Sequence, residues 1–204
     1  MDSTKEKVSY CIGLETGKNL KMQFSDIDLP LLLQGFQDAV SDSDPKLKED
    51  EVMQIMQALR TQIEMQQREF LARLSADNKK SGEEFLAQNK KQSGVMTLSS
   101  GLQYKVLSSG SGATPKPFDA VTAHYKGSFI DGRVFDSSYE RGQPYQFFVN
   151  RVIPGWSEAL QLMKEGDKWE LFIPSYLAYG EAGFGNHIGP NVALVFEIEL
   201  VKVN

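Results

Sequence analysis

The sequence of 204 residues is poor in cysteine, in long apolar runs and in net charge. Its single cysteine, Cys11, cannot form an internal disulfide; we expect a small buried hydrophobe, the alternatives being an interchain bridge or a reactive thiol. No run approaches the roughly 18 apolar residues of a membrane span, and Met1–Lys7 lacks the apolar centre of a signal peptide. We therefore expect a cytosolic chain, or a mature secreted form whose leader has been replaced by Met1. The net charge of −5 argues against electrostatic capture of nucleic acid.

Metal ligands are also scarce, since the chain has two histidines. His124 falls on the polar side of an alternating strand pattern. His187 lies in a loop and has no second ligand at a recognised spacing. We therefore predict no metal site and no cofactor.

Proline, glycine and aromatic residues are rare in the first part of the chain and frequent in the second. The first 94 residues hold two of the eight prolines, five of the 17 glycines and five of the 21 aromatic residues. This division predicts an α+β protein with a helical first part and a turn-rich antiparallel sheet in the second. We expect a helical module at residues 1–44, a long connecting helix at 45–94 and a sheet domain at 95–204.

The first part predicts three helices. Two short ones are expected at Lys5–Met22 and Asp28–Val40, separated by a turn around Phe24-Ser25-Asp26. A third helix, of about 48 residues, is expected to begin at Ser43-Asp44-Pro45, which offers an N-cap and a proline at the first helical position. It is expected to stop at Gly94, because glycine commonly follows the last turn of a helix.

The predicted long helix carries a narrow apolar stripe in its first half. The stripe recurs at steps of three and four residues and consists of Val52, Met56, Leu59, Ile63, Phe70 and Leu74. Beyond the stripe, Ser75–Gln92 has few large apolar residues and is predicted to be a solvated stalk, with Gly82 as a candidate bend.

The short helices and the stripe need a partner to be buried, and a second copy of the chain is the simplest one. Methionines would give such an interface soft and adaptable contacts. The alternatives are that they form part of a core or that they form a surface for client proteins. The residues concerned are Met22, Met53, Met56 and Met65.

The second part alternates apolar and polar residues as half-buried strands do. Asp131-Gly132 predicts a hairpin turn, and Trp156–Met163 predicts a short helix laid across the sheet. The apolar members of the two clearest strands are Val121, Ala123 and Tyr125 in one, and Leu194, Phe196, Ile198 and Leu200 in the other.

Three short motifs combine one carboxylate with large apolar and aromatic side chains. They are Val134-Phe135-Asp136-Ser137-Ser138, Val152-Ile153-Pro154-Gly155-Trp156 and Ala178-Tyr179-Gly180. Together they predict a small hydrophobic cavity without a metal-ligand set, an activated nucleophile or a phosphate loop. Such a cavity suits chemistry that breaks no covalent bond, and rotation about a peptidyl-prolyl bond is of that kind.

In their order and approximate spacing, these motifs, with Tyr125 and Leu194-Val195-Phe196, resemble the FKBP-type peptidyl-prolyl cis/trans isomerases. The first part of the chain resembles the macrophage infectivity potentiator (Mip) branch of that family. The resemblance implies an antiparallel sheet curled around one short helix, and a V-shaped homodimer formed through the N-terminal module. The segments that resemble the Mip branch are Ser9-Tyr10-Cys11-Ile12-Gly13, Gln34-Gly35-Phe36-Gln37-Asp38-Ala39 and Gly101-Leu102-Gln103-Tyr104-Lys105-Val106.

The resemblance also implies roles for twelve residues. Tyr125, Asp136 and Tyr179 would be catalytic, with Asp136 as a polar wall group held by the Tyr125 hydroxyl and with the Tyr179 hydroxyl donating to a substrate carbonyl. The Ile153 backbone N–H would anchor another carbonyl, and Trp156 would form the floor. The substrate-binding residues would be Phe135, Tyr145, Phe147, Val152, Ile153, Trp156, His187, Ile188 and Phe196.

The function that the resemblance implies is a prolyl isomerase that accelerates proline-limited folding, with chaperone-like client binding by the dimer. The alternative is a non-catalytic peptide-binding holdase that uses the same pocket. The implied partners are proline-containing peptides, unfolded protein clients and macrolide inhibitors of the rapamycin type. The implied location is the periplasm or outer membrane of a Gram-negative bacterium if a leader was removed, and the alternative is the cytoplasm.

Overall fold

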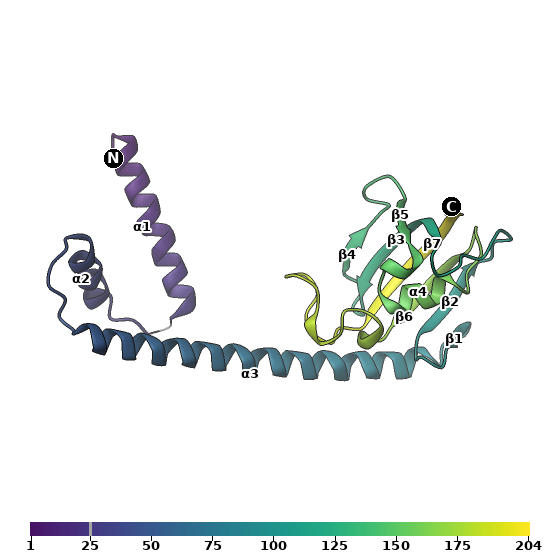
Figure 1. Cartoon of the computed structure of the whole chain (residues 1–204), viewed down its shortest axis with the longest axis horizontal. Coiled ribbons are helices and arrows are strands. Elements are labelled where there is room, and N and C mark those ends of the chain that lie inside the picture. The colour runs from purple at the N-terminus through teal and green to yellow at the C-terminus, as the bar shows by residue number, and fades with distance from the viewer. Residues whose placement is uncertain (25) are drawn as a thin grey trace. The chain divides into compact units, whose positions relative to one another are not determined.

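The computed structural model describes residues 1–24 and 26–204, which form two compact units, Met1–Gln62 and Ile63–Asn204 (Figure 1). Ser25, in the middle of the predicted turn, lies outside the described residues. The division falls within the long helix, rather than at residue 44 or 94, so each half of that helix belongs to a different unit. No helix in the described ranges is long and apolar enough to cross a membrane.

The two short helices begin at polar caps. α1 (Thr4–Gln23) is capped by Ser3, whose hydroxyl accepts a hydrogen bond from the Glu6 N–H, while the Glu6 carboxylate accepts one from the Ser3 N–H, both at 3.2 Å. α2 (Leu29–Val40) is capped by Asp28, which accepts a hydrogen bond from the backbone N–H three residues later at 3.0 Å. These caps satisfy N–H groups that have no partner within the helix. Both predicted helices are confirmed to within one residue at each end.

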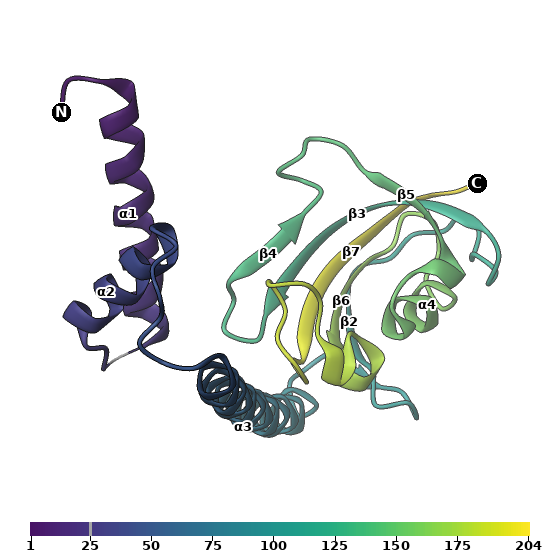
Figure 2. The same cartoon turned by 60° about the vertical axis from the view of Figure 1, so that its left-hand side comes forward.

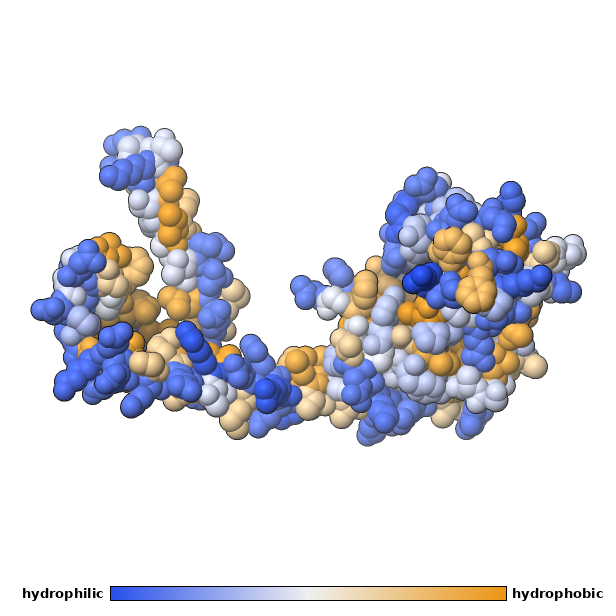
Figure 3. Space-filling model, in the orientation of Figure 1, coloured by the Kyte–Doolittle hydropathy of each residue, from blue (hydrophilic) through white to orange (hydrophobic). Residues whose placement is uncertain are grey.

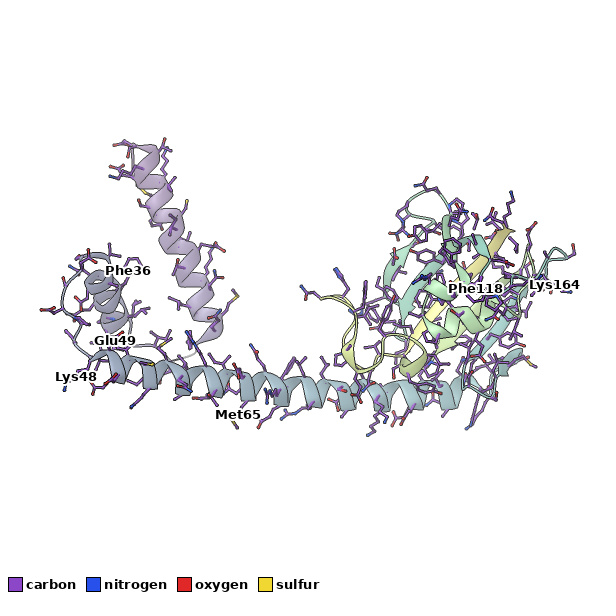
Figure 4. The ribbon with its side chains drawn as sticks, viewed as in Figure 1. Phe36, Lys48, Glu49, Met65, Phe118 and Lys164 are labelled. Carbon is purple, nitrogen blue, oxygen red and sulfur yellow. The ribbon has the colours of Figure 1, made fainter. Side chains whose placement is uncertain are left out.

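The long helix, α3 (Glu49–Asn89), is shorter than predicted and begins after Pro45 rather than at it. The Glu51 carboxylate accepts a hydrogen bond from the Lys48 backbone N–H at 3.1 Å, where α3 begins (Figure 4). Three acidic residues in the first turn also lie at the positive end of the helix dipole. The predicted start was wrong because these groups stabilise a later first turn.

The helices of the first unit leave their apolar side chains on the surface. Neither α1 nor α2 contains a buried residue, and Figure 3 shows apolar residues in orange along both helices. Cys11 is exposed as well, so the expectation of a buried cysteine was wrong for the single chain. The exposed large apolar residues of this unit include Val8, Tyr10, Ile12, Leu14, Met22, Leu29, Leu31, Leu33, Phe36, Val40, Leu47, Val52, Met53, Ile55 and Met56.

The second unit contains an antiparallel sheet in the order β1-β2-β6-β7-β3-β4, with β5 paired to the first half of β3. Gly132 adopts a φ of 88° in the turn between β3 and β4, as the hairpin prediction requires. The strands are β1 (Val95–Thr97), β2 (Gln103–Ser108), β3 (Ala120–Phe129), β4 (Val134–Ser137), β5 (Tyr145–Phe148), β6 (Lys168–Ile173) and β7 (Leu194–Val203).

One short helix, α4 (Pro154–Leu160), packs against one face of this sheet (Figure 2). Its residues Trp156, Ala159 and Leu160 are buried among apolar side chains of the sheet. Three short 3-10 turns complete the unit, at Val149–Arg151 (η1), Ser175–Leu177 (η2) and Gly180–Ala182 (η3). The sheet members of the core include Val121, Ala123, Leu171, Ile173, Leu194, Phe196, Ile198 and Leu200, so the predicted fold class and strand faces are confirmed.

Within this unit, the second half of α3 packs on the sheet instead of standing in solvent. The Phe85 ring lies 6.1 Å from that of Phe172, which points away from the α4 side because its neighbours along β6 are in the core. The Gln103 side chain donates to the Leu86 carbonyl at 2.9 Å, and Gly82 is buried. The predicted solvated stalk was therefore wrong, because the packed face of α3 combines Phe85 with small and polar residues that no apolar stripe marks.

Gly82 is a point of close approach and not a bend, since α3 continues through it. A Cβ atom at this position would lie 2.8 Å from the Cβ of Ala193. Gly82→Ala should therefore destabilise the second unit by about 1–3 kcal/mol through overpacking. Helix propensity alone would stabilise it by about 1 kcal/mol.

Urea denaturation of the full chain measures this effect, with Ser81→Ala as the control. Ser81 is exposed in the same turn of the helix. Its replacement should leave the free energy of unfolding unchanged or raise it by about 0.5 kcal/mol or less. A more stable Gly82→Ala protein would contradict the close approach.

Candidate active site

A cavity of about 610 Å³ opens on the second unit, beside α4. It is walled by side chains from β3, β4, β5 and β7 and from the loops that follow β5 and β6. Its lining residues are Tyr125, Phe135, Asp136, Tyr145, Phe147, Arg151, Val152, Ile153, Trp156, Tyr179, Phe184 and Phe196.

Ten of the twelve site residues chosen from the sequence line this one cavity, and His187 and Ile188 do not. Ile188 is 4% exposed and belongs to the core. His187 lines a separate cleft of about 320 Å³ with residues of α3 and of the β3–β4 turn. Phe184, from the same loop, takes the place at the cavity that was expected for His187 and Ile188.

The floor of the cavity is the indole of Trp156. Its ring centroid lies 5.2 Å from that of Tyr125, 5.4 Å from that of Phe147 and 5.1 Å from that of Phe196. The three neighbours come from β3, β5 and β7, so the floor is assembled by the whole curled sheet. Among the described residues, no acceptor binds the buried indole Nε1–H.

The sequence around Trp156 explains how the indole reaches this position. Pro154 occupies the first turn of α4, where its missing N–H costs no helical hydrogen bond. Gly155 packs so closely on the sheet that an added Cβ would lie 2.7 Å from Cγ2 of Ile173. This approach lets the next residue insert its ring between the helix and the sheet.

One wall of the cavity is polar. The Tyr125 hydroxyl donates to Oδ2 of Asp136 at 2.6 Å, and Arg141 forms an ion pair with Oδ1 of the same carboxylate. Arg141 Nη2 also donates to the Tyr125 hydroxyl oxygen at 2.6 Å, and its guanidinium lies 5.4 Å from the Tyr125 ring centroid. Arg141 was missed from the sequence, because it lies in the loop between β4 and β5, where no periodicity marks the inward residues.

The surroundings of these groups shift their pKa values in different directions. Burial raises the pKa of Tyr125 to about 12, and the hydrogen bond to Asp136 adds to the rise. Burial acts to raise the pKa of Asp136 as well, but the hydrogen bonds from Tyr125 and Arg141 outweigh it, and the pKa lies below its ordinary value. Burial, followed by the charge of Asp136, raises the pKa of Tyr179. At neutral pH the carboxyl is therefore an anion and both hydroxyls keep their protons.

Two residues that line the cavity carry hydrogen-bond donors without a partner in the described part of the chain. None of residues 1–24 and 26–204 accepts a hydrogen bond from the Tyr179 hydroxyl or from the Ile153 backbone N–H. The Tyr179 ring stacks on Phe184, with 5.0 Å between centroids. The arrangement can hold a small apolar ring on the indole while two donors bind backbone carbonyls beside it. Within the same described ranges, no group of three or more His, Cys, Asp or Glu side chains gathers as a metal site would require.

Comparison with protein families finds two matches that together span most of the chain. Residues 112–201 match the model of the FKBP-type peptidyl-prolyl cis-trans isomerase. Residues 5–106 match that of the domain amino terminal to FKBP-type peptidyl-prolyl isomerase.

Individual relatives match over nearly the whole chain. The outer membrane protein MIP of Legionella longbeachae is 42% identical over 203 residues, with 100% of this chain and 87% of the relative covered. The FKBP-type 22 kDa peptidyl-prolyl cis-trans isomerase of Escherichia coli K12 is also 42% identical, with 99% and 97% covered. The crystal structure of FkpA from Escherichia coli superposes with a TM-score of 0.79 at 39% identity, covering 100% of this chain and 98% of that one.

Arg141→Gln should raise the pKa of Asp136, because it removes a hydrogen bond and a positive charge from the carboxylate. A carboxyl whose pKa is lowered by folding stabilises the fold above its unfolded pKa of about 4, and this contribution is lost as the pH falls through the folded value. The unchanged protein should therefore lose more stability on acidification below about pH 4 than the variant does.

NMR titration of the Asp136 carboxyl, together with thermal melts across the acid range, measures both effects. Arg133→Gln is the control, because Arg133 pairs with Asp131 at 2.8 Å and does not contact Asp136. An Asp136 pKa that is the same with and without Arg141 would contradict this account of the polar wall.

Proposed function

The chain belongs to the FKBP-type peptidyl-prolyl cis-trans isomerases, and from this premise we propose that the cavity over Trp156 is its isomerase site. The single observation that supports this proposal most is the convergence of ten residues on one cavity with the indole as its floor. Those residues come from three motifs and four strands that are far apart in the sequence.

The reaction requires rotation about an amide bond whose resonance imposes a barrier of about 18–20 kcal/mol. The planar amide carries more charge separation than the twisted one, so an apolar cavity favours the twisted form. The aromatic floor and walls provide that environment, and a substrate proline ring would lie against the Trp156 indole. The step needs no covalent intermediate, because only a torsion changes.

The polar groups would hold the substrate backbone while the proline amide rotates. The Ile153 N–H and the Tyr179 hydroxyl are donors with no acceptor among the described residues, and each would bind a substrate carbonyl. The Asp136 carboxylate is already engaged by Tyr125 and Arg141, so we assign it to the wall as a fixed negative charge. Binding of the substrate residues on either side of the proline lowers the barrier if these contacts are strongest when the amide is twisted.

Tyr179→Phe should lower kcat/KM on a proline tetrapeptide by about five- to tenfold, since one hydrogen bond to the substrate is lost. Asp136→Ala should lower it by at least about tenfold, since it removes a charged partner from Tyr125 and Arg141. A protease-coupled isomerisation assay measures both. Tyr139→Phe is the matched control, because its hydroxyl donates to Glu199 at 2.9 Å and does not line the cavity.

Equal activity of Asp136→Ala and the unchanged protein would remove Asp136 from the mechanism. The family comparisons favour turnover over the alternative of a non-catalytic holdase. The same assay tests that alternative, because a holdase would bind the tetrapeptide without accelerating its isomerisation.

We also propose that the first unit forms a homodimer. Its helices expose a long series of large apolar side chains, and α1 and α2 bury none in the single chain. Apolar surface of this extent is normally covered by a partner. A hollow of about 780 Å³ between α2 and the start of α3, lined by Leu31, Ala39, Leu47 and Val52 among others, offers a place for side chains of a second copy.

A dimer would bind an unfolded protein through two isomerase sites at once. The second contact becomes intramolecular, so it acts at an effective concentration set by the distance between the sites. Clients would therefore be held far more tightly than short peptides, which reach one site only. This is the basis of the chaperone-like activity that we propose.

The full chain should sediment as a dimer of the 22.8 kDa protein, and Phe36→Glu should shift it towards monomer. Phe118→Glu, at a phenylalanine of the second unit that is 79% exposed against 65% for Phe36, should not (Figure 4). Catalysed refolding of a proline-limited protein should fall by at least about tenfold in the monomeric variant, while tetrapeptide activity stays the same. A fall of both activities by the same factor would show that dimerisation does not contribute to client capture.

The proposed location is the bacterial cell envelope, periplasmic or associated with the outer membrane. It is supported by the name of the Legionella relative, an outer membrane protein. Cell fractionation with an antibody tests it, and recovery in the cytoplasmic fraction would favour the alternative location.

Macrolides of the rapamycin type are proposed inhibitors, because the cavity offers an apolar floor and two unpaired donors. Inhibition of tetrapeptide isomerisation by rapamycin tests this proposal. An activity that persists at saturating inhibitor would exclude it.

A further inference from the structure

Two of the cavity residues, Tyr179 and Phe184, lie in the long loop between β6 and β7. The loop has little regular structure of its own beyond η2, η3 and one isolated bridge between Phe184 and Ile188. A loop of this kind is normally among the least stable parts of a protein. Its cavity residues therefore depend on contacts that come from elsewhere.

The second half of α3 supplies those contacts. Asn78 Nδ2 donates a hydrogen bond to the Pro190 carbonyl at 2.8 Å, and Ser75 Oγ accepts one from Asn191 Nδ2 at 2.8 Å. One turn further along the helix, Gly82 lies against Ala193. Figures 1 and 2 both show the end of the loop lying along this part of α3.

Asn191 connects the helix to the cavity residues through hydrogen bonds on both sides. Its side chain is held by Ser75, while its backbone N–H donates to the Gly180 carbonyl at 2.8 Å. Its φ of 54° is an unusual value for a residue with a side chain. Gly180 directly follows Tyr179, so two hydrogen bonds connect α3 to the backbone beside the cavity hydroxyl.

We propose that Ser75 and Asn78 are positioning residues of the isomerase site, which act by holding the loop that carries Tyr179 and Phe184. The proposal rests on the proposed function, in which the Tyr179 hydroxyl binds a substrate carbonyl. The second half of α3 is then part of the catalytic unit. A fragment that begins at residue 95 would contain every cavity residue but would lose the groups that hold two of them.

The test compares alanine variants of the full chain at two pairs of matched positions. Asn78→Ala is compared with Asn89→Ala. Asn89 on the same helix also donates one hydrogen bond, to Gln103 Oε1 of β2 at 2.9 Å, and β2 is far from the loop in sequence. Ser75→Ala is compared with Ser81→Ala, because Ser81 is exposed and makes no hydrogen bond to Asn191. Thermal melts establish that each variant is folded.

Asn78→Ala and Ser75→Ala should lower kcat/KM on the tetrapeptide by about fivefold, the factor that corresponds to about 1 kcal/mol. Hydrogen exchange of the segment 179–192 should become faster in these two variants only. Asn89→Ala and Ser81→Ala should keep both the activity and the exchange of that segment.

A double-mutant cycle separates positioning from general destabilisation. If Asn78 acts through Tyr179, the loss in Asn78→Ala with Tyr179→Phe should be smaller than the product of the two single losses. The proposal would be overturned if the loss of kcat/KM in the double variant equalled the product of the two single losses. Equal losses in Asn78→Ala and Asn89→Ala would also overturn it and leave α3 with a structural role alone. Full activity of Tyr179→Phe by itself would instead overturn the proposed role of Tyr179, and the positioning proposal with it.

Discussion

The second unit depends on the packing of one side chain, the indole of Trp156, which belongs to the core and to the cavity at the same time. Its aromatic neighbours come from β3, β5 and β7, and edge or tilted contacts of this kind each contribute about 0.5–1.5 kcal/mol beyond the burial of their area. The cavity therefore exists only when the sheet has closed around α4. The same side chain therefore contributes to the stability of the fold and to the floor of the site.

The polar groups of the site are arranged around this apolar floor and not within it. The carboxylate of Asp136 is kept ionised by Tyr125 and Arg141, and burial keeps the tyrosine hydroxyls protonated. A low dielectric strengthens each of these interactions, but it also makes an unpaired polar group costly. The Tyr179 hydroxyl and the Ile153 N–H thus gain most when a ligand supplies the acceptors that they lack.

The long helix shows how far a hydrophobic pattern can be trusted. Its first half carries large apolar residues at helical spacing, and of these Val52, Met56 and Phe70 remain exposed in the single chain. Its second half packs closely on the sheet domain through Ser75, Asn78 and Gly82. A search for a stripe of large apolar residues finds the first face and misses the second, since most of the second face consists of small side chains and hydrogen-bonding groups.

The sequence by itself determined the two short helices, which the structure shows to begin at the caps Ser3 and Asp28. It also determined the strand faces, through strict alternation, and most of the cavity residues, through three motifs. The helices, the strand faces and each motif depend on neighbours along the chain, although the motifs form one cavity only when the sheet closes around α4. Only the tertiary structure decided that Phe184 rather than His187 faces the cavity, that Arg141 pairs with Asp136, and that α3 holds the loop. Those residues lie in loops or on a polar helix face, where no period marks the inward side and the packing of distant elements chooses it.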